Sequence, residues 1–107
     1  MPGYRYRITV EPLNDKKGEP LNAEPLSFEV ENHDEILSIV NRITARDDLG
    51  FDEQKSAAFA VGLKLFSEVM MEHRKDPLFA PLRDPFREFM MTLKKGGKPR
   101  ESSEEEQ

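Results

Sequence analysis

The sequence contains no cysteine, and this absence excludes several kinds of chemistry at once. Disulfides, thiolate metal sites and cysteine nucleophiles all require a thiol. Three mechanistic motifs are also missing: a glycine-rich phosphate loop, the G-x-S-x-G nucleophile turn and the H-E-x-x-H zinc pattern. We therefore expect no cofactor and no bound metal, and the sequence nominates no catalytic residue.

Long apolar runs are missing as well. The longest, AAFAVGL at residues 57–63, is much shorter than the roughly 18 residues that a membrane-spanning helix needs. The chain opens with MPGYRYRITVEP, which lacks the apolar stretch of a secretory signal. Together these features predict a cytoplasmic protein that does not bind membranes.

Positive charge is in deficit, with 16 basic against 21 acidic residues and a formal net charge of −5. An acidic domain is poorly suited to the phosphate backbone, where positive charge supplies most of the affinity. A ribbon–helix–helix arrangement would expose Ser27, Glu29 and Glu31 to the bases, and phosphate would repel those acids. We therefore expect no nucleic-acid binding.

The length of 107 residues predicts one domain. The last segment, residues 96–107 (GGKPRESSEEEQ), has no apolar residue larger than proline and cannot contribute to a core. We predict a single α+β domain over residues 1–95, followed by a disordered acidic tail at 96–107.

Two segments alternate strictly between apolar and polar residues, which is typical of half-buried strands: about 4–11 (YRYRITVE) and 26–31 (LSFEVE). The segment between them, residues 12–25, contains three prolines and a glycine and is predicted to be a loop. One antiparallel register places apolar residues opposite apolar residues and arginine opposite glutamate. That register pairs Val10 with Leu26, Ile8 with Phe28, Tyr6 with Val30, Arg7 with Glu29 and Arg5 with Glu31.

Three later segments have helical spacing of apolar residues, at about 33–46, 53–75 and 85–95. Apolar residues cover most of the circumference of the second helix, so we expect it at the centre of the domain. The predicted fold is a two-stranded antiparallel sheet packed against these three main helices.

Several residues mark where these helices begin and end. Asn32 with Glu35 three positions later resembles a capping box, and Asp52 is placed to cap the second helix. Gly50 suits a left-handed turn between the first two helices. Gly62 lies inside the second helix, where glycine costs about 1 kcal/mol, so we attribute it to a closely packed neighbour.

The stretch HRKDPLFAPLRDPFREFMM contains prolines at 77, 81 and 85. Asp76 and Asp84 each precede a proline, an arrangement typical of a helix start. Pro81 lacks the N–H that a longer helix from Pro77 would need, so that helix is predicted to be about one turn long. The prolines are therefore interpreted as helix boundaries, with the last helix restarting at Asp84.

Four apolar residues near these boundaries are candidates for an interaction surface, because they either cover the core or form an exposed patch. They are Met71, Leu78, Phe79 and Leu82. The alternative is a ligand cleft at Glu72, His73 and Asp76, which requires an apolar pocket with polar groups converging on it.

With YRYRITVEPL, PLSFEVENHDEILSIV and AAFAVGLKLFSEVMMEHRKDPLFAPLRDPFREFM in view, the chain resembles a family of short bacterial proteins known only as a domain of unknown function. The resemblance covers about Tyr4 to Lys95. It implies a bacterial cytoplasmic origin and brings no activity, ligand or catalytic residue.

The function favoured by these observations is a non-catalytic protein-interaction module with an unknown protein partner. A two-stranded sheet has two open edges, so we expect a homodimer formed by strand pairing. The alternative function is a small-ligand-binding protein or an enzyme that uses the cleft near His73.

Overall fold

The computed structural model of the protein describes residues 3–96. Its internal contacts define two compact units, one ending at Glu35 and the other beginning at Ile36. The predicted tail lies outside the described residues except for Gly96. Organisation as one domain over residues 1–95 stays a prediction.

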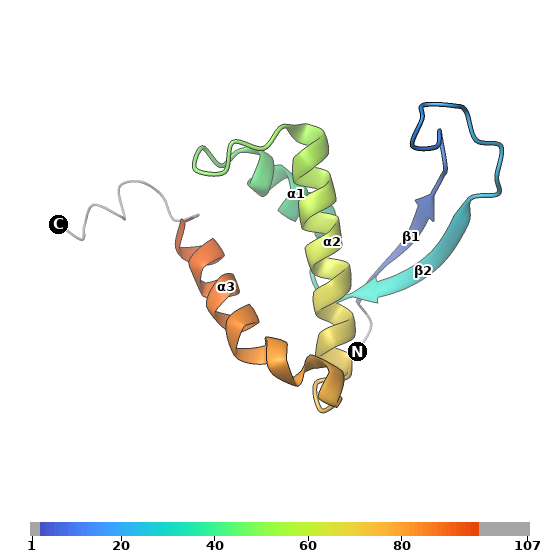
Figure 1. Ribbon diagram of the computed structural model, residues 1–107. Coiled ribbons are helices and arrows are strands. Elements are labelled where there is room, and N and C mark those ends of the chain that lie inside the picture. The colour runs from blue at the N-terminus through green and yellow to red at the C-terminus, as the bar shows by residue number, and fades with distance from the viewer. Residues whose placement is uncertain (1–2, 97–107) are drawn as a thin grey trace. The chain divides into compact units, whose positions relative to one another are not determined.

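The first unit is an antiparallel hairpin of β1 (Tyr4–Val10) and β2 (Leu26–Asn32) (Figure 1). The predicted register is confirmed at all five pairs, and two further pairs join Thr9 to Ser27 and Tyr4 to Asn32. Alternation places the apolar residues of both strands on one face and the charged residues on the other. The sequence pattern therefore determined the alignment of the two strands.

The predicted loop between the strands is confirmed, and it has an internal structure that was not predicted. An isolated antiparallel bridge joins Asn14 to Pro20. Within it, the Asp15 carboxylate accepts hydrogen bonds at 2.9 Å from the backbone N–H groups of Lys17 and Glu19. The short aspartate side chain thus binds two backbone N–H groups of the turn, and both bonds are made within the loop.

The second unit contains the three expected helices and a short 3₁₀ helix. They are α1 (Ile36–Thr44), α2 (Glu53–Glu72), the 3₁₀ helix η1 (Pro77–Leu82) and α3 (Arg83–Gly96). In Figure 1, α1 lies beside α2, whereas α3 leads back from η1 at an angle to α2. The existence and order of all three main helices are confirmed.

Two local predictions at helix ends are confirmed. The Asp52 carboxylate accepts a hydrogen bond of 2.7 Å from the backbone N–H of Lys55, as an N-cap should. Gly50 has a φ of +65°, in the left-handed region. The connection from α1 to α2 therefore depends on local residues that the sequence identifies.

The predicted start of the first helix directly after Asn32 is wrong. Asn32 is the last residue of β2, and α1 begins only at Ile36, three residues later than predicted. The Asn32 side-chain oxygen accepts a hydrogen bond of 3.0 Å from the backbone N–H of Asp34. This local bond turns the chain immediately after the strand and delays the start of the helix.

The predicted restart at Asp84 is also wrong. The 3₁₀ helix η1 continues directly into α3 at Arg83, whose backbone N–H donates to the carbonyl of Ala80. Asp84 therefore lies inside the first turn of α3, and Pro85 follows it where no N–H partner is needed. The cap predicted at Asp76 is confirmed, because its carboxylate accepts a bond of 2.9 Å from the N–H of Leu78.

The core of the second unit is small. Its buried apolar residues are Ile36, Ile43, Ala60 and Met70. In α2 only Ser56, Ala60 and Met70 are buried, although its apolar residues cover most of the circumference. No atom lies within 4 Å of the position that a Cβ on Gly62 would occupy, so the close neighbour predicted there is absent from the part of the chain that the structure describes.

Candidate functional site

The apolar residues predicted to form an interaction surface lie at the end of α2 and along η1. Leu78 is 73% exposed and Met71 is also exposed, whereas Phe79 and Leu82 are half-buried. We call these four residues the η1 patch. Leu78 therefore exposes a large apolar side chain on a 3₁₀ helix that Asp76 caps.

Aromatic contacts join η1 to α2, and α2 to α3. The ring of Phe79 meets Phe66 of α2 edge to face, with 6.0 Å between ring centroids. Phe66 also meets Phe86 of α3 at 6.1 Å, and Phe86 lies 6.0 Å from Phe89. Such pairs contribute about 0.5–1.5 kcal/mol each beyond area burial. The half-buried side of the η1 patch is therefore structural, which leaves Leu78 as its most accessible residue.

Two members of this aromatic cluster, Phe66 and Phe89, are themselves exposed and were not predicted as contact residues. Their apolar spacing on α2 and α3 was visible in the sequence. Spacing alone does not reveal whether another element covers a helical face.

The residues of the alternative ligand cleft build the turn between α2 and η1. The backbone N–H of His73 donates to the carbonyls of Val69 and Met70, which ends α2. The backbone N–H of Asp76 donates to the carbonyl of His73 at 2.9 Å, and the Asp76 carboxylate caps η1. The side chains of Glu72, His73 and Asp76 are all exposed. Their observed roles are those of helix ends.

Arg83 strengthens the same turn from the start of α3. Its guanidinium donates to the backbone carbonyl of Arg74 and lies 3.4 Å from that of Asp76. A cation beside the free carbonyls that follow α2 is favoured by the helix dipole. The turn that presents the η1 patch is therefore fixed by backbone hydrogen bonds, one carboxylate and one guanidinium.

A second fixed point joins the connection between α1 and α2 to the end of α3. The Arg46 side chain is 14% exposed and makes two hydrogen bonds, of 2.9 and 2.6 Å, to the Asp48 carboxylate. A third nitrogen donates to the carbonyl of Leu93 at 2.8 Å. The hydrogen bond with Asp48 raises the pKa of Arg46. The role of Arg46 is structural, because its guanidinium binds Asp48 and the carbonyl of Leu93 and so attaches α3 to the connection between α1 and α2.

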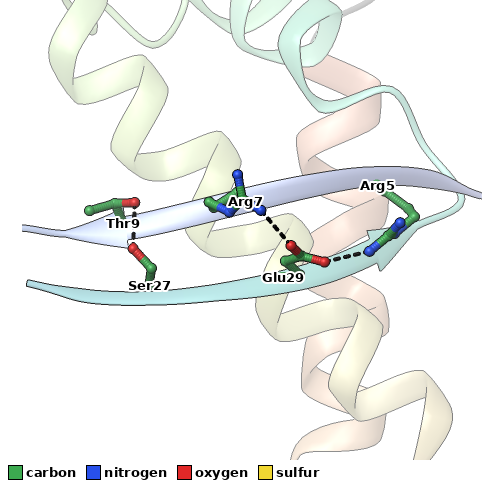
Figure 2. Close-up of polar contacts among 5 residues, drawn as sticks. All are labelled: Arg5, Arg7, Thr9, Ser27 and Glu29. Atoms are coloured by element: carbon green, nitrogen blue, oxygen red, sulfur yellow. Dashed lines mark hydrogen bonds and ion pairs between the residues drawn. The ribbon is translucent and has the colours of Figure 1, made fainter.

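The polar face of the hairpin carries a compact charged cluster. Glu29 lies between two arginines: one carboxylate oxygen accepts from Arg7 at 2.7 Å, and the other accepts from Arg5 (Figure 2). Arg5 therefore reaches diagonally past Glu31, the residue directly opposite. Glu31 instead accepts a hydrogen bond of 2.6 Å from the backbone N–H of Gly3.

The apolar face and the loop of the hairpin expose several large side chains. Val10 is 56% exposed and Leu13 is 70% exposed. The backbone N–H of Leu21 donates to the carbonyl of Leu13 at 3.0 Å, which holds two exposed leucines side by side. Leu26 and Phe28 are also exposed on the same face as Val10. The hairpin thus presents a second apolar surface.

Groups suited to metal binding do not assemble in this fold. Among residues 3–96, no three histidine, aspartate or glutamate side chains lie close enough together to hold a metal ion. Within the same range, no helix combines the length and apolar character needed to cross a membrane.

Comparison with known proteins places this architecture in a recognised group. Residues 4–95 match the model of a family described as a domain of unknown function with a solved structure, DUF3861. The chain is also similar to a crystal structure of a protein of unknown function from Pectobacterium atrosepticum, at 41% sequence identity and a TM-score of 0.73. That match covers 87% of this chain and 98% of the other. None of the curated proteins compared with the chain is significantly similar to it.

Proposed function

Since the chain belongs to the DUF3861 family, whose function is unknown, we propose its role from its own surfaces: a small, non-catalytic protein-interaction module. It acts as a homodimer in the bacterial cytoplasm and binds a protein partner through the η1 patch. The observation that carries this proposal is the exposure of Leu78 on a turn that is otherwise held rigidly.

Rigidity supports the choice of the η1 patch as the binding surface. Ordering a flexible segment on binding reduces affinity, whereas a preorganised surface avoids that cost. Asp76 caps η1, Arg83 binds the carbonyls before it, and Phe79 packs on Phe66. Leu78 is thereby presented without needing to be ordered, as expected of a residue that anchors an interface.

The ligand cleft near His73 has weaker support. A ligand site requires concavity and converging polar groups. The backbone of His73 and the carboxylate of Asp76 are both engaged in ending one helix and starting the next. We therefore do not advance a catalytic or ligand-binding role for these residues.

Homodimerisation is supported by the composition of the sheet. A two-stranded hairpin is marginal by itself, and each of its strands leaves one edge unpaired. Pairing two hairpins across a two-fold axis would remove one open edge from each chain. No metal or cofactor is needed for this role.

The experiment that tests the η1 patch is site-specific photo-crosslinking in a bacterial lysate. Leu78 is replaced by a photoreactive amino acid, and Glu88, which is exposed on α3, is replaced in a matched control. We expect one protein adduct from position 78 and none from position 88. Excess unlabelled wild-type protein should compete for the adduct, and an excess of the Leu78→Asp variant should not.

Because Leu78 is exposed, Leu78→Asp should fold normally, which circular dichroism can verify. If adducts form equally from both positions, or if Leu78→Asp competes as well as wild type, the η1 patch is not the binding surface. Absence of any adduct from position 78 would have the same meaning.

A further inference from the structure

The outer edge of β1 has the properties of an edge that pairs with another strand. β1 is bonded to β2 on one side only in the described sheet. Natural edge strands are commonly protected by proline, by a bulge or by a charge that points into the apolar face. β1 contains no proline, its register with β2 is unbroken, and its apolar face carries Tyr4, Tyr6, Ile8 and Val10.

Only some registers allow β1 to pair with a second β1 across a two-fold axis. Directly opposite residues must point to the same face of the sheet, so one residue must lie opposite its own copy, and the two-fold axis passes between these two copies. We name each register by that residue. An axis at Arg7 places that arginine opposite its own copy. An axis at Tyr6 places Arg5 opposite Arg7, and like charges directly opposite are destabilising.

An axis at Ile8 gives a fully complementary match. Arg5 then lies opposite the partner's Glu11, Arg7 opposite the partner's Thr9, and Tyr6 opposite the partner's Val10. The paired segment extends from Arg5 to Glu11 in both chains. An axis at Thr9 places Arg7 opposite the partner's Glu11 but shortens the paired segment and leaves Arg5 without an acidic partner.

The charges already present on the hairpin favour the same register. Arg5 and Arg7 share the carboxylate of Glu29, whereas Glu31, directly opposite Arg5, accepts from the backbone of Gly3. Glu11, the residue that follows β1, is exposed and is placed to contact Arg5 of a second copy. Each chain therefore carries both halves of an interchain ion pair.

The edge of β2 is a poorer candidate. Its polar face carries Glu29 and Glu31, and an axis at Glu29 or Val30 would place acid opposite acid. An axis at Phe28 avoids this clash but forms no ion pair, and Pro25 ends the paired segment because it cannot donate a ladder hydrogen bond. Self-complementarity is therefore a property of β1.

We propose that a second copy of this chain pairs with β1 antiparallel about Ile8, which gives a four-stranded sheet in the order β2–β1–β1–β2. The inference rests on the proposed homodimer and specifies its interface. The sheet joins the apolar faces of both hairpins into one surface and leaves only the β2 edges open.

The chain has no native cysteine, so a single introduced cysteine reports this interface without ambiguity. In the Ile8→Cys variant the two cysteines face each other across the axis, at about 4.5–5.5 Å between Cα atoms, which a disulfide can span. In Tyr6→Cys the two positions lie about 13 Å apart along the strands. In Phe28→Cys they are separated by about 14 Å across three strand spacings.

We expect oxidation of the full-length protein to yield a disulfide-linked dimer for Ile8→Cys and at least tenfold less dimer for the other two variants. Preferential cross-linking of Phe28→Cys would assign the interface to β2. Equal cross-linking of all three variants, or none, would refute pairing about Ile8. Assemblies larger than a dimer in native mass spectrometry would indicate open-ended pairing of β1 with β2 and would also overturn the proposal.

The ion pair provides an independent test. Glu11→Arg places like charges opposite each other at two symmetric positions, and loss of two surface pairs should raise the dimer dissociation constant by about 2- to 30-fold. Glu19→Arg makes the same charge change in the loop and should leave that constant unchanged. Equal effects of the two variants would exclude contact between Arg5 and the partner's Glu11.

These outcomes separate the interface from the function. A dimeric wild-type protein without the Ile8→Cys cross-link would refute this interface and leave the homodimer in place. Specific cross-linking from Leu78 in a monomeric protein would refute the homodimer and leave the protein-binding role in place.

Discussion

Replacing Gly62 with alanine tests whether the exposed face of α2 is free in the folded protein. Gly62 lies in the interior of a 20-residue helix, and its φ is not positive. A Cβ at this position would meet no atom within 4 Å in the described chain. Alanine can therefore adopt the native conformation without strain.

The expected gain follows from helix propensity. Glycine is less favourable than alanine in a helix interior by about 0.8–1.0 kcal/mol, partly because it gives the unfolded chain more freedom. With no new contact to add or remove, Gly62→Ala should stabilise the protein by about that amount. For a domain of this size the gain corresponds to a rise of roughly 4–8 °C in Tm.

Urea unfolding followed by circular dichroism at 222 nm measures this change as a shift of the midpoint at constant slope. Gly50→Ala is the matched control, because a Cβ there also meets no atom within 4 Å but the backbone has a φ of +65°. That variant should be destabilised, since alanine does not readily adopt the left-handed conformation. Glycine to alanine is thus expected to stabilise the protein at position 62 and to destabilise it at position 50, although a Cβ has space at both positions.

A destabilised Gly62→Ala variant would refute the reasoning. It would mean that another surface approaches this face of α2 closely enough to clash with a methyl group. If the loss grew with protein concentration, that surface would belong to a second chain, and α2 would contribute to an interface between copies.

Three further changes should have smaller or graded effects, all measurable by urea unfolding. Asp52→Ala should cost about 1 kcal/mol because it removes an N-cap, whereas Asp84→Ala should change stability by less than about 0.5 kcal/mol because Asp84 lies inside the first turn of α3 and its ion pair with Arg87, at 3.7 Å, is exposed. Arg46→Lys keeps the charge but loses the two-bond contact with Asp48 and should cost about 1–2 kcal/mol, with faster amide exchange at the end of α3. Glu29→Gln should cost less than about 1 kcal/mol, and the cost should shrink in high salt because the ion pairs are exposed.

The strand register was predictable because it depends on a pattern that is complete within two short segments. A shift of one residue would move every apolar side chain of β1 to the charged face. The ion pairs on that face were only partly predictable. Arg5 reaches Glu29 diagonally instead of Glu31 because its long side chain can contact either acid, and Glu31 is engaged by the backbone of Gly3.

Helix ends were predictable where one side chain decides them. Asp52 and Asp76 each cap the helix that follows, as their spacing indicates. The start predicted at Asn32 failed because β2 extends to Asn32, whose side chain accepts from Asp34, and the start predicted at Asp84 failed because η1 runs directly into α3. In both cases the preceding element extends further than its sequence pattern indicates, and that pattern does not rank two local arrangements of the same residues.

Surface exposure was the least predictable property, since it depends on which elements cover a helix. The sequence placed the η1 patch at the correct helix boundary but did not distinguish exposed Leu78 from half-buried Phe79. It also assigned Gly62 to close packing, although the described chain leaves that position open. Apolar spacing on a helix thus predicts an apolar face, but it does not determine whether an element of the same chain or of another chain covers that face.

Whether the apolar faces of the helices are covered or exposed affects the stability of the folded chain. Full burial of a leucine, valine or phenylalanine side chain contributes about 1.5–3 kcal/mol, so exposed residues of this size forgo a large favourable term. In the second unit the exposed large apolar residues outnumber the buried ones; they are Leu37, Phe66, Val69, Met71, Leu78, Phe89 and Met91. Single apolar residues on a surface are ordinary. Here, however, exposed Phe66 contacts Phe79, and Phe79 is next to exposed Leu78 in the sequence, so both exposed residues lie at the same turn. Caps, an arginine and edge-to-face aromatic rings hold this turn while Leu78 stays exposed, and the proposed protein-binding role rests on that combination.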